Sequence, residues 1–332
     1  MGAHSSHAHS SSVALLRIQK QQVPRTQHNS TQGILNMNKI RKIFTLLCTA
    51  SLCLSLTACA GKANHAVDSF DTSTIPEDKE ISSLVPAKNK ELLKVAIDSP
   101  YIPAGFFDDK NQATGYEVDV VRALARVLGI KNVQFSDVDF DSILSQVDNG
   151  TYDMAAAAMT VKKSRMRDLN MVAYIQSGFI YGTQKNNPKN FDYGDPCGFT
   201  IAAKSNTSQE ELLHDLSETC KETGKNAIKI VADKDQDKLI NEVANGSIDA
   251  IIGESAIIKY AETRNKNFAS VGESFQMAPQ GLATAKNNEP LAKATQAGLQ
   301  KLMDQGILKQ VMAPWGVESF ALNYATLNPP IA

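Results

Sequence analysis

An internal repeat constrains the fold of this 332-residue chain more than any other feature. Residues 141–153 (DSILSQVDNGTYD) align without gaps on residues 237–249 (DKLINEVANGSID), at a constant offset of 96. Each copy has the pattern of an amphipathic helix, an Asn-Gly stop that accepts a left-handed residue, and an Asp before an apolar strand. Because a solenoid needs three or more stacked copies, two copies predict two similar α/β lobes that face each other. A ligand cleft is expected where their strands end.

The rest of the sequence alternates between strand and helix patterns in the same way. An apolar run at 92–97 predicts a buried strand, and helical spacing of apolar residues predicts a helix at 116–128 that ends at Gly129. This alternation indicates α/β construction. Further strands are expected near 154–158, 199–203, 228–231 and 249–252, and further helices near 141–148, 208–222, 236–244 and 289–304.

The amino-terminal part has the pattern of an export signal. From Met37 the chain has a basic flank, then an uncharged and largely apolar stretch at 43–58, then Cys59. This predicts a secretory signal peptide at 37–58, since the apolar stretch is short for a membrane-spanning helix. The sequence LTAC at 56–59 resembles the lipobox of bacterial lipoproteins. That resemblance implies a lipidated Cys59 that anchors the protein to the extracytoplasmic face of the membrane.

The residues on either side of this signal are interpreted as parts without a fold of their own. Residues 1–36 are rich in Ser, His and Gln without apolar periodicity, so they are expected to be a non-native or mis-assigned leader. Residues 59–90 are polar and have no sustained period, which predicts a flexible tether.

Charge is distributed unevenly along the chain. The net charge of -1 includes six basic and no acidic residues at 1–58, which leaves 28 basic against 35 acidic residues from 59 onward. An acidic domain argues against sequence-independent nucleic-acid binding, which needs a basic face. With 42% hydrophobic residues, the chain is able to bury a substantial core.

Cysteine usage is consistent with export. Cys48 and Cys53 leave with the signal and Cys59 carries the lipid, so Cys197 and Cys220 remain. An even remainder in an exported chain predicts one disulfide between them, with two separate buried thiols as the alternative.

The sequence lacks the common catalytic and metal-binding motifs. It has no dinucleotide or phosphate loop, no Gly-x-Ser-x-Gly and no His-Glu-x-x-His. After Cys59 the only histidines are His65 and His214, so no His-based triad or zinc site is expected. Three Asp at 233–237 mimic the start of a calcium loop, but the later Gly and Glu are missing, which favours a solvated acidic turn. We expect neither a metal nor a cofactor.

Polar residues follow the two repeated strands. Arg165 comes soon after the strand that ends at 157–160, and Gly253 and Glu254 end the matching strand. Residues 204–208 open a helix, where Ser208 and Glu211 have the spacing of a capping box. Backbone N–H groups at that helix start, together with Arg165, predict a carboxylate receptor, and Glu254 would hold an ammonium. Surface ion pairs are the alternative for each residue taken alone.

From Leu92 to about Val317 the chain resembles the polar amino acid-binding proteins of bacterial ATP-binding-cassette importers, the extracellular solute-binding protein family 3. The resemblance implies a two-lobed α/β fold of the type II periplasmic-binding-protein kind, with an amino acid, a permease and its ATPase as partners. Lobe 1 is expected at 91–183 and 284–332 and lobe 2 at 184–283, joined by two crossing strands near 179–185 and 281–286. The residues that carry the resemblance are Asp98, Tyr101, 115–119, Phe140, 153–160, Arg165, 248–250, Trp315 and Gly316.

The same resemblance implies roles for individual residues. Tyr101 and Phe140 flank the ligand side chain, and Arg165 grips the α-carboxylate with backbone N–H groups near Ala158, Thr160 and Thr207. Glu254 stands where the family usually has Asp and holds the α-ammonium. The complete predicted set is Asp98, Tyr101, Phe140, Ala157, Ala158, Thr160, Arg165, Lys204, Thr207, Ser208, Gly253 and Glu254.

Four charges in this set predict the ligand class. A zwitterion uses Arg165 and Glu254, and Asp98 and Lys204 neutralise each other if both point inward. This favours a neutral polar amino acid, glutamine first, with cystine or a basic amino acid next. The chain is predicted to be a monomeric binding protein and not an enzyme. The alternatives are a prephenate or arogenate dehydratase-like enzyme on the same fold, with Glu254 as its acid, and a ligand sensor or adhesin.

Overall fold

The computed structural model describes residues 69–331, which lie within one compact unit. The predicted leader, signal peptide and lipidated Cys59 lie outside the described residues. Among the helices of residues 69–331, none combines the length and apolar content needed to cross a membrane.

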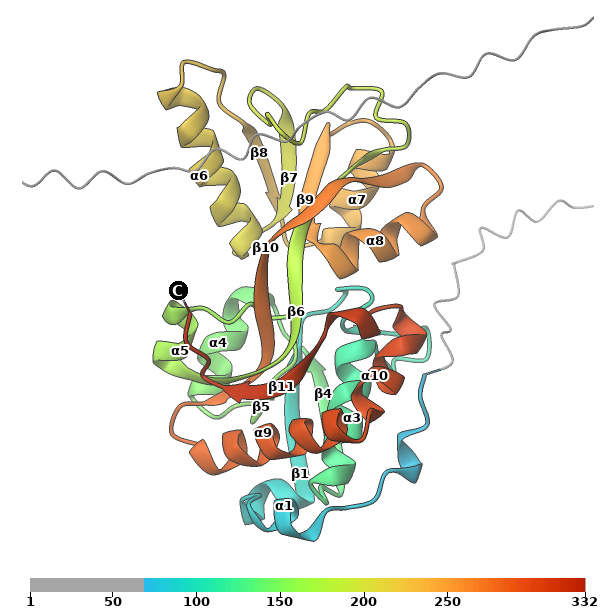
Figure 1. The fold of residues 1–332 in the computed structure, drawn as a ribbon, viewed down its shortest axis with the longest axis vertical. Coiled ribbons are helices and arrows are strands. Elements are labelled where there is room, and N and C mark those ends of the chain that lie inside the picture. The colour runs from blue at the N-terminus through green and yellow to red at the C-terminus, as the bar shows by residue number, and fades with distance from the viewer. Residues whose placement is uncertain (1–68, 332) are drawn as a thin grey trace, which may run out of the picture. The chain divides into compact units, whose positions relative to one another are not determined.

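The described chain forms two α/β lobes that share one mixed sheet (Figure 1). The strand order is β4-β1-β5-β10-β6-β9-β7-β8, with β11 beside β6. Lobe 1 contains β1 (Leu92–Ile97), β4 (Asn132–Asp137), β5 (Met154–Ala155), β11 (Ala321–Leu327) and the small pair β2 (Phe106–Phe107) and β3 (Ala113–Thr114). Lobe 2 contains β7 (Thr200–Lys204), β8 (Lys229–Asp233) and β9 (Ala250–Glu254).

Helices cover both faces of the sheet in each lobe. The α/β construction predicted from the alternating patterns is confirmed, and each predicted strand and helix has a counterpart within a few residues. Lobe 1 has α3 (Tyr116–Val127), α4 (Phe140–Asp148), α5 (Lys163–Asp168), α9 (Glu289–Asp304) and α10 (Ile307–Met312), and lobe 2 has α6 (Ser208–Glu222), α7 (Gln236–Ala244) and α8 (Ser255–Arg264).

The internal repeat has equivalent structures in the two lobes. Gly150 and Gly246, which follow α4 and α7, both have positive φ (+79° and +83°). The Asp that closes each copy then accepts a hydrogen bond from the strand beside it: Asp153 from the backbone N–H of Lys94 and Asp249 from that of Thr200. Each copy therefore attaches one helix and one parallel strand to the sheet of its lobe.

Two long antiparallel strands, β6 (Leu169–Gln184) and β10 (Phe268–Ala285), run through both lobes (Figure 1). Strand β6 pairs with β11 as far as Ile175 and with β9 from Phe179, so the stretch between the lobes is 176–178. The predicted crossing near 179–185 and 281–286 was therefore misplaced by several residues. Three register shifts in β10 interrupt the alternation that would have located it.

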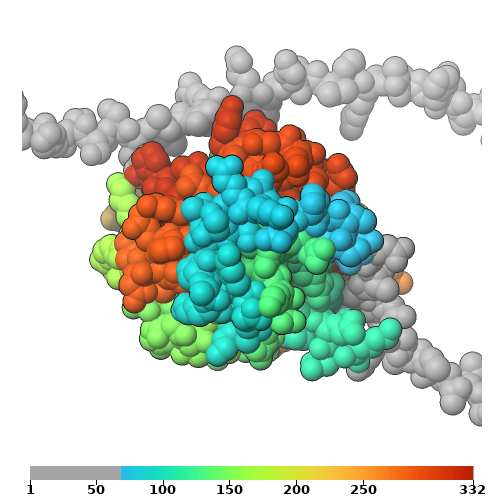
Figure 2. Space-filling view, turned by 90° about the horizontal axis from the view of Figure 1, so that it is seen from below, coloured from blue at the N-terminus to red at the C-terminus, as the bar shows by residue number. Residues whose placement is uncertain are grey.

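Part of the predicted tether is folded onto lobe 1. Residues 72–91 form a short 3-10 helix (Thr72–Thr74) and two five-residue helices, α1 (Lys79–Ser83) and α2 (Ala87–Glu91). Ile75 and Val85 are buried in the lobe 1 core. The blue-to-cyan beginning of the described chain covers much of the face in Figure 2. Helices this short show no sustained period, which is why the sequence suggested a flexible segment.

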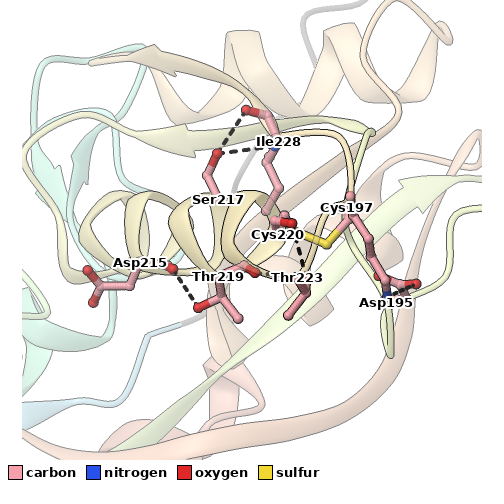
Figure 3. Close-up of a disulfide and its surroundings, with 9 residues drawn as sticks. Asp195, Cys197, Asp215, Ser217, Thr219, Cys220, Thr223 and Ile228 are labelled. Atoms are coloured by element: carbon pink, nitrogen blue, oxygen red, sulfur yellow. Dashed lines mark hydrogen bonds and ion pairs between the residues drawn. A yellow bond between two sulfur atoms is a disulfide. The ribbon is translucent and has the colours of Figure 1, made fainter.

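The predicted disulfide joins Cys197 and Cys220 in lobe 2 (Figure 3). Cys220 lies near the end of α6, and Cys197 lies in the loop before β7. Ser217, on the same helix, exchanges hydrogen bonds with the backbone of Ile228 before β8. The carboxyl-terminal half of α6 is thus attached to the segments that precede β7 and β8, two neighbouring strands of the sheet.

Candidate ligand-binding site

A small cavity between the lobes gathers nearly all the predicted ligand residues. Eleven of the twelve line it, together with Gln209, which the sequence analysis missed. Gly253 does not, because it packs against Ile258 and Gln236 instead. The space open to the centre of a water molecule is about 10 Å3, roughly the room for one water. The lining residues are Asp98, Tyr101, Phe140, Ala157, Ala158, Thr160, Arg165, Lys204, Thr207, Ser208, Gln209 and Glu254.

Arg165 is the cation on the lobe 1 side of the cavity. It lies on α5 and is 6% exposed. Its Nη1 donates a hydrogen bond to the carbonyl oxygen of Thr160 at 2.9 Å, and its guanidinium lies 5.4 Å from the centre of the Phe140 ring. Burial lowers the pKa of Arg165 to about 10, so the side chain remains charged at neutral pH. Only one guanidinium nitrogen donates to another described residue, which leaves donors for an anionic ligand group.

The start of α6 faces Arg165 from lobe 2. Thr207 is the N-cap, and its Oγ1 accepts a hydrogen bond from the backbone N–H of Glu210. The predicted capping box with Ser208 and Glu211 was therefore wrong by one residue, because Thr207 has extended backbone angles and Ser208 begins the helix. Glu211 instead pairs with Lys162 across the lobes at 2.7 Å.

The backbone N–H groups of Thr160, Thr207 and Ser208, all of which line the cavity, donate to no other residue of 69–331. The buried Ser208 hydroxyl also has no hydrogen-bond partner there. Ala158, by contrast, donates its N–H to Glu117 at 2.5 Å. The prediction that the Ala158 N–H contributes to the carboxylate receptor was therefore wrong, although Ala158 does line the cavity.

Glu254 is the buried carboxylate at the end of β9. Its Oε1 accepts a hydrogen bond from Gln209 Nε2 at 2.8 Å, and its Oε2 is buried without a hydrogen-bond partner among the described residues. Burial raises the pKa of the Glu254 carboxyl to about 7. Gln209 directly follows Ser208 in the first turn of α6. This position next to a predicted lining residue was the one sequence signal for the role of Gln209.

Asp98 and Lys204 form a buried ion pair between the lobes. Lys204 Nζ lies 3.1 Å from Asp98 Oδ2, with side chains 6% and 8% exposed respectively. Lys204 also donates to the backbone carbonyl of Lys234 and lies 5.6 Å from the centre of the Tyr101 ring. Burial raises the pKa of Asp98 to about 6, and the charge of Lys204 opposes this rise. The two charges face each other in the same cavity as Arg165 and Glu254.

A larger cavity of about 600 Å3 lies elsewhere, between Ile102 of lobe 1 and helices α7 and α8. Its lining shares no residue with the small cavity. Its two cations, Arg264 and Lys266, are exposed, so water screens them and they are poorly suited to fixing one ligand pose. The buried charges at the strand ends make the small cavity the better ligand site.

Two of the three carboxylates in the acidic turn at 233–237 have partners within the protein. Asp233 accepts a hydrogen bond from the N–H of Asp235 and pairs with Lys238, while Asp235 caps α7 by accepting from the N–H of Lys238. Within residues 69–331 there is no group of three or more His, Cys, Asp or Glu side chains placed to hold a metal ion.

Two lobes that meet over a buried polar cavity are suited to enclosing a small molecule. This architecture is the type II periplasmic-binding-protein fold. The chain belongs to the bacterial extracellular solute-binding proteins, family 3, whose sequence profile matches residues 93–318. Members of this family are extracytoplasmic, bind amino acids and work with ATP-binding-cassette permeases.

Comparison with individual proteins supports the same class. The arginine-binding protein ArgT of Corynebacterium glutamicum is 29% identical over 255 residues, which covers 75% of this chain and 83% of ArgT. The glutamine-binding protein GlnH of a Bacillus subtilis ABC transporter is 23% identical over 288 residues, covering 83% of this chain and 97% of GlnH. Both relatives are amino acid-binding proteins, and GlnH belongs to an ABC transporter.

A solved structure extends the likeness to the fold. The crystal structure of the ancestral amino acid-binding protein AncCDT-1, a precursor of cyclohexadienyl dehydratase, superposes with a TM-score of 0.62. It is 23% identical and covers 70% of this chain and 99% of its own. At this identity the likeness establishes the shared fold alone.

Proposed function

We propose that this protein captures a neutral polar amino acid, glutamine first, between its lobes and delivers it to a membrane permease. The single observation that carries the proposal is the set of four buried charges in one cavity: Asp98, Arg165, Lys204 and Glu254. Arg165 and the free N–H groups suit an α-carboxylate, and Glu254 suits an α-ammonium. The remaining two charges already neutralise each other, so a charged ligand side chain would be buried without a counter-ion.

Capture requires the lobes to move. The cavity has roughly the space of one water molecule, which is too little for an amino acid, so the lobes separate for entry and close on the ligand. Side chains from both lobes line the cavity, and a bridging ligand favours the closed state because it contacts both. The stretch between the lobes at 176–178 and the adjoining part of β10 would provide the hinge.

The export features complete the proposal. A signal peptide at 37–58 and a lipid on Cys59 would place the domain on the extracytoplasmic face of the membrane, next to the permease and its ATPase. In this arrangement residues 59–71 would act as the tether, and the domain would act as a monomer. Incorporation of labelled palmitate into the expressed full chain, and its loss in Cys59→Ser, tests the anchor.

Calorimetric titration of the described domain with single amino acids tests the ligand. Glutamine is expected to bind more tightly than arginine, lysine or glutamate. Tight binding of arginine with none of glutamine would overturn the choice of ligand and leave the transport class intact. Cystine is the next neutral candidate, since two L-cystine-binding proteins are 24% and 23% identical to this chain.

An enzymatic alternative rests on one observation. Glu254 has a pKa near 7, which is suitable for a general acid at neutral pH. The same residue serves an ammonium equally well, and Arg165 across the cavity supplies the carboxylate partner of a simple zwitterion. Incubating the purified domain with prephenate and measuring phenylpyruvate separates the two functions, because a binding protein forms no product.

A further inference from the structure

A fully buried glutamate lies behind the ligand cavity, outside the set of lining residues. Glu117 is on the first turn of α3 and is 0% exposed. Its Oε2 accepts a hydrogen bond from the backbone N–H of Ala158 at 2.5 Å, and its Oε1 accepts one from the Tyr174 hydroxyl at 2.6 Å. Tyr174 comes from β6, so this one carboxyl group links three separate elements of lobe 1.

Ala158 has a backbone conformation that alanine rarely adopts. Its φ is +46°, in the left-handed region, where the Cβ atom comes too close to the following carbonyl oxygen. The residue is 6% exposed and lines the cavity. A strained conformation at a ligand site persists only when the surrounding structure enforces it.

The hydrogen bonds around Ala158 show what enforces this conformation. The N–H of Ala156 donates to Ala96, and the carbonyl of Met159 accepts from Gly281. These bonds fix the two ends of the segment to the sheet. At Ala158 itself the N–H has one partner, Glu117, and the carbonyl accepts from no other residue of 69–331. Without Glu117 this buried N–H would lack an acceptor.

We propose that Glu117 is a positioning residue for the ligand-binding segment 156–160: by accepting the Ala158 N–H it holds Ala158 in the left-handed conformation and orients the segment for the ligand. The inference rests on the proposed function, since it concerns the same cavity. The Ala158 N–H is directed into lobe 1, away from the ligand. The neighbouring Thr160 N–H remains free to face the carboxylate beside Arg165.

This role needs an acceptor of the right length, not a negative charge. Burial raises the pKa of Glu117 to about 7, so its charged and neutral forms are both populated near neutral pH. A protonated carboxyl accepts from Ala158 with one oxygen and donates to the Tyr174 oxygen with the other. A glutamine amide has the same options. Glu117→Gln should therefore preserve the segment, whereas Glu117→Leu removes the acceptor at similar volume.

The same helix offers a matched control. Asp119 is 1% exposed and accepts hydrogen bonds from Trp315 Nε1 at 2.9 Å and from Arg122. It does not line the cavity. Asp119→Leu therefore removes a buried carboxylate from the same helix without touching the ligand-binding segment. A general loss of packing around α3 would affect both Leu variants alike.

The experiment measures L-glutamine and L-arginine affinity by calorimetry, and thermal unfolding, for the wild-type domain and the three variants. Loss of a buried acceptor is expected to lower affinity for the bound amino acid roughly 10- to 100-fold in Glu117→Leu. Glu117→Gln is expected within about threefold of wild type, and Asp119→Leu is expected to lower the unfolding temperature with unchanged affinity. Equal affinity in Glu117→Leu and wild type would overturn the inference, as would equal losses in the two Leu variants.

A ligand-independent measurement separates this inference from the proposed function. Amide hydrogen exchange at Ala158, followed by NMR, is expected to be slow in wild type and Glu117→Gln and much faster in Glu117→Leu. If no amino acid binds the wild-type domain, the proposed function fails, and the exchange result still decides whether Glu117 holds this segment.

If Glu117→Leu does not fold, Tyr174→Phe and Glu117→Asp provide milder tests. Glu117→Asp, one methylene shorter, is expected to speed exchange, and unchanged exchange there contradicts the inference.

Discussion

Asp98 and Lys204 occupy equivalent positions in the two lobes, and their side chains meet at 3.1 Å. Asp98 directly follows β1, and Lys204 ends β7. Each of these strands pairs in parallel with the strand that closes one copy of the repeat, Val95 with Met154 and Ile201 with Ala250. The equivalent strands β1 and β7 thus place opposite charges at matching ends, and the two charges meet between the lobes.

Lys204→Met should change which side chain the cavity accepts. The variant keeps most of the aliphatic stem and removes the ammonium, so Asp98 faces the ligand without a cation. Preference for L-arginine over L-glutamine is expected to increase roughly tenfold or more, since a hydrogen bond to a charged group is worth about 1.5–3 kcal/mol. Calorimetry at pH 8, where Asp98 ionises readily, measures both affinities.

Lys162→Met is the matched control for this change. It removes a different ion pair between the lobes, the one with Glu211, from a residue that does not line the cavity. Its ratio of arginine to glutamine affinity should equal that of the wild type. An unchanged ratio in Lys204→Met would mean that the ligand side chain does not approach Asp98.

Arg165→Ala should remove the principal cation for the α-carboxylate. Affinity for the bound amino acid is expected to fall by roughly 1.5–3 kcal/mol or more, the value of a charge-assisted bidentate contact. Arg167→Ala, on the same helix but exposed, provides the control and should bind as the wild type does. Titration calorimetry that finds both variants equal to wild type would place the ligand elsewhere.

Local sequence patterns were sufficient to predict most of the fold. Apolar periodicity located β1 and α3, and the repeat of 141–153 at 237–249 indicated two lobes. The errors have physical causes. Bulges in β10 hide the crossing point, and the helices at 79–91 are too short to show a period.

Prediction of the site was limited by contacts between residues distant in sequence. Strand ends and the family resemblance identified eleven of the lining residues. The contact from Gln209 to Glu254 spans 45 residues, and that from Ala158 to Glu117 spans 41. Neither leaves a local pattern, so the sequence could not show that the Ala158 N–H was already occupied.

Removing the disulfide should destabilise lobe 2 without abolishing ligand binding. Cys197 and Cys220 are 23 residues apart, and on the chain-entropy model closing such a loop contributes roughly 3 kcal/mol. Neither residue lines the cavity. The double variant Cys197→Ser/Cys220→Ser should show a lower unfolding temperature by calorimetry, with affinity at 15 °C close to wild type. A large loss of affinity in the folded variant would contradict this separation.

Ligand affinity should rise with pH through about 7, because the α-ammonium needs an ionised Glu254. Burial raises the pKa of this carboxyl from 4.5 to about 7, so in the ligand-free protein it is protonated in more acidic solution. Binding an ammonium expels that proton, and affinity therefore falls by up to about tenfold per pH unit below the pKa. The stability of the fold depends on pH in the opposite direction. The folded state binds the proton of Glu254 more tightly than the unfolded state does, so ionisation of Glu254 lowers the free energy of unfolding as pH rises from 4.5 to about 7.

Titrations between pH 5.5 and 8.5 in wild type and Glu254→Gln isolate this effect. The variant is expected to bind more weakly at pH 8 and to lose most of the pH dependence, because its amide does not titrate. Asp98, with a pKa near 6, provides a second and more acidic titration. Asp98→Asn should remove that component and retain the change near pH 7. If Glu254→Gln retained the full wild-type slope near pH 7, the ammonium would have to contact a group other than Glu254.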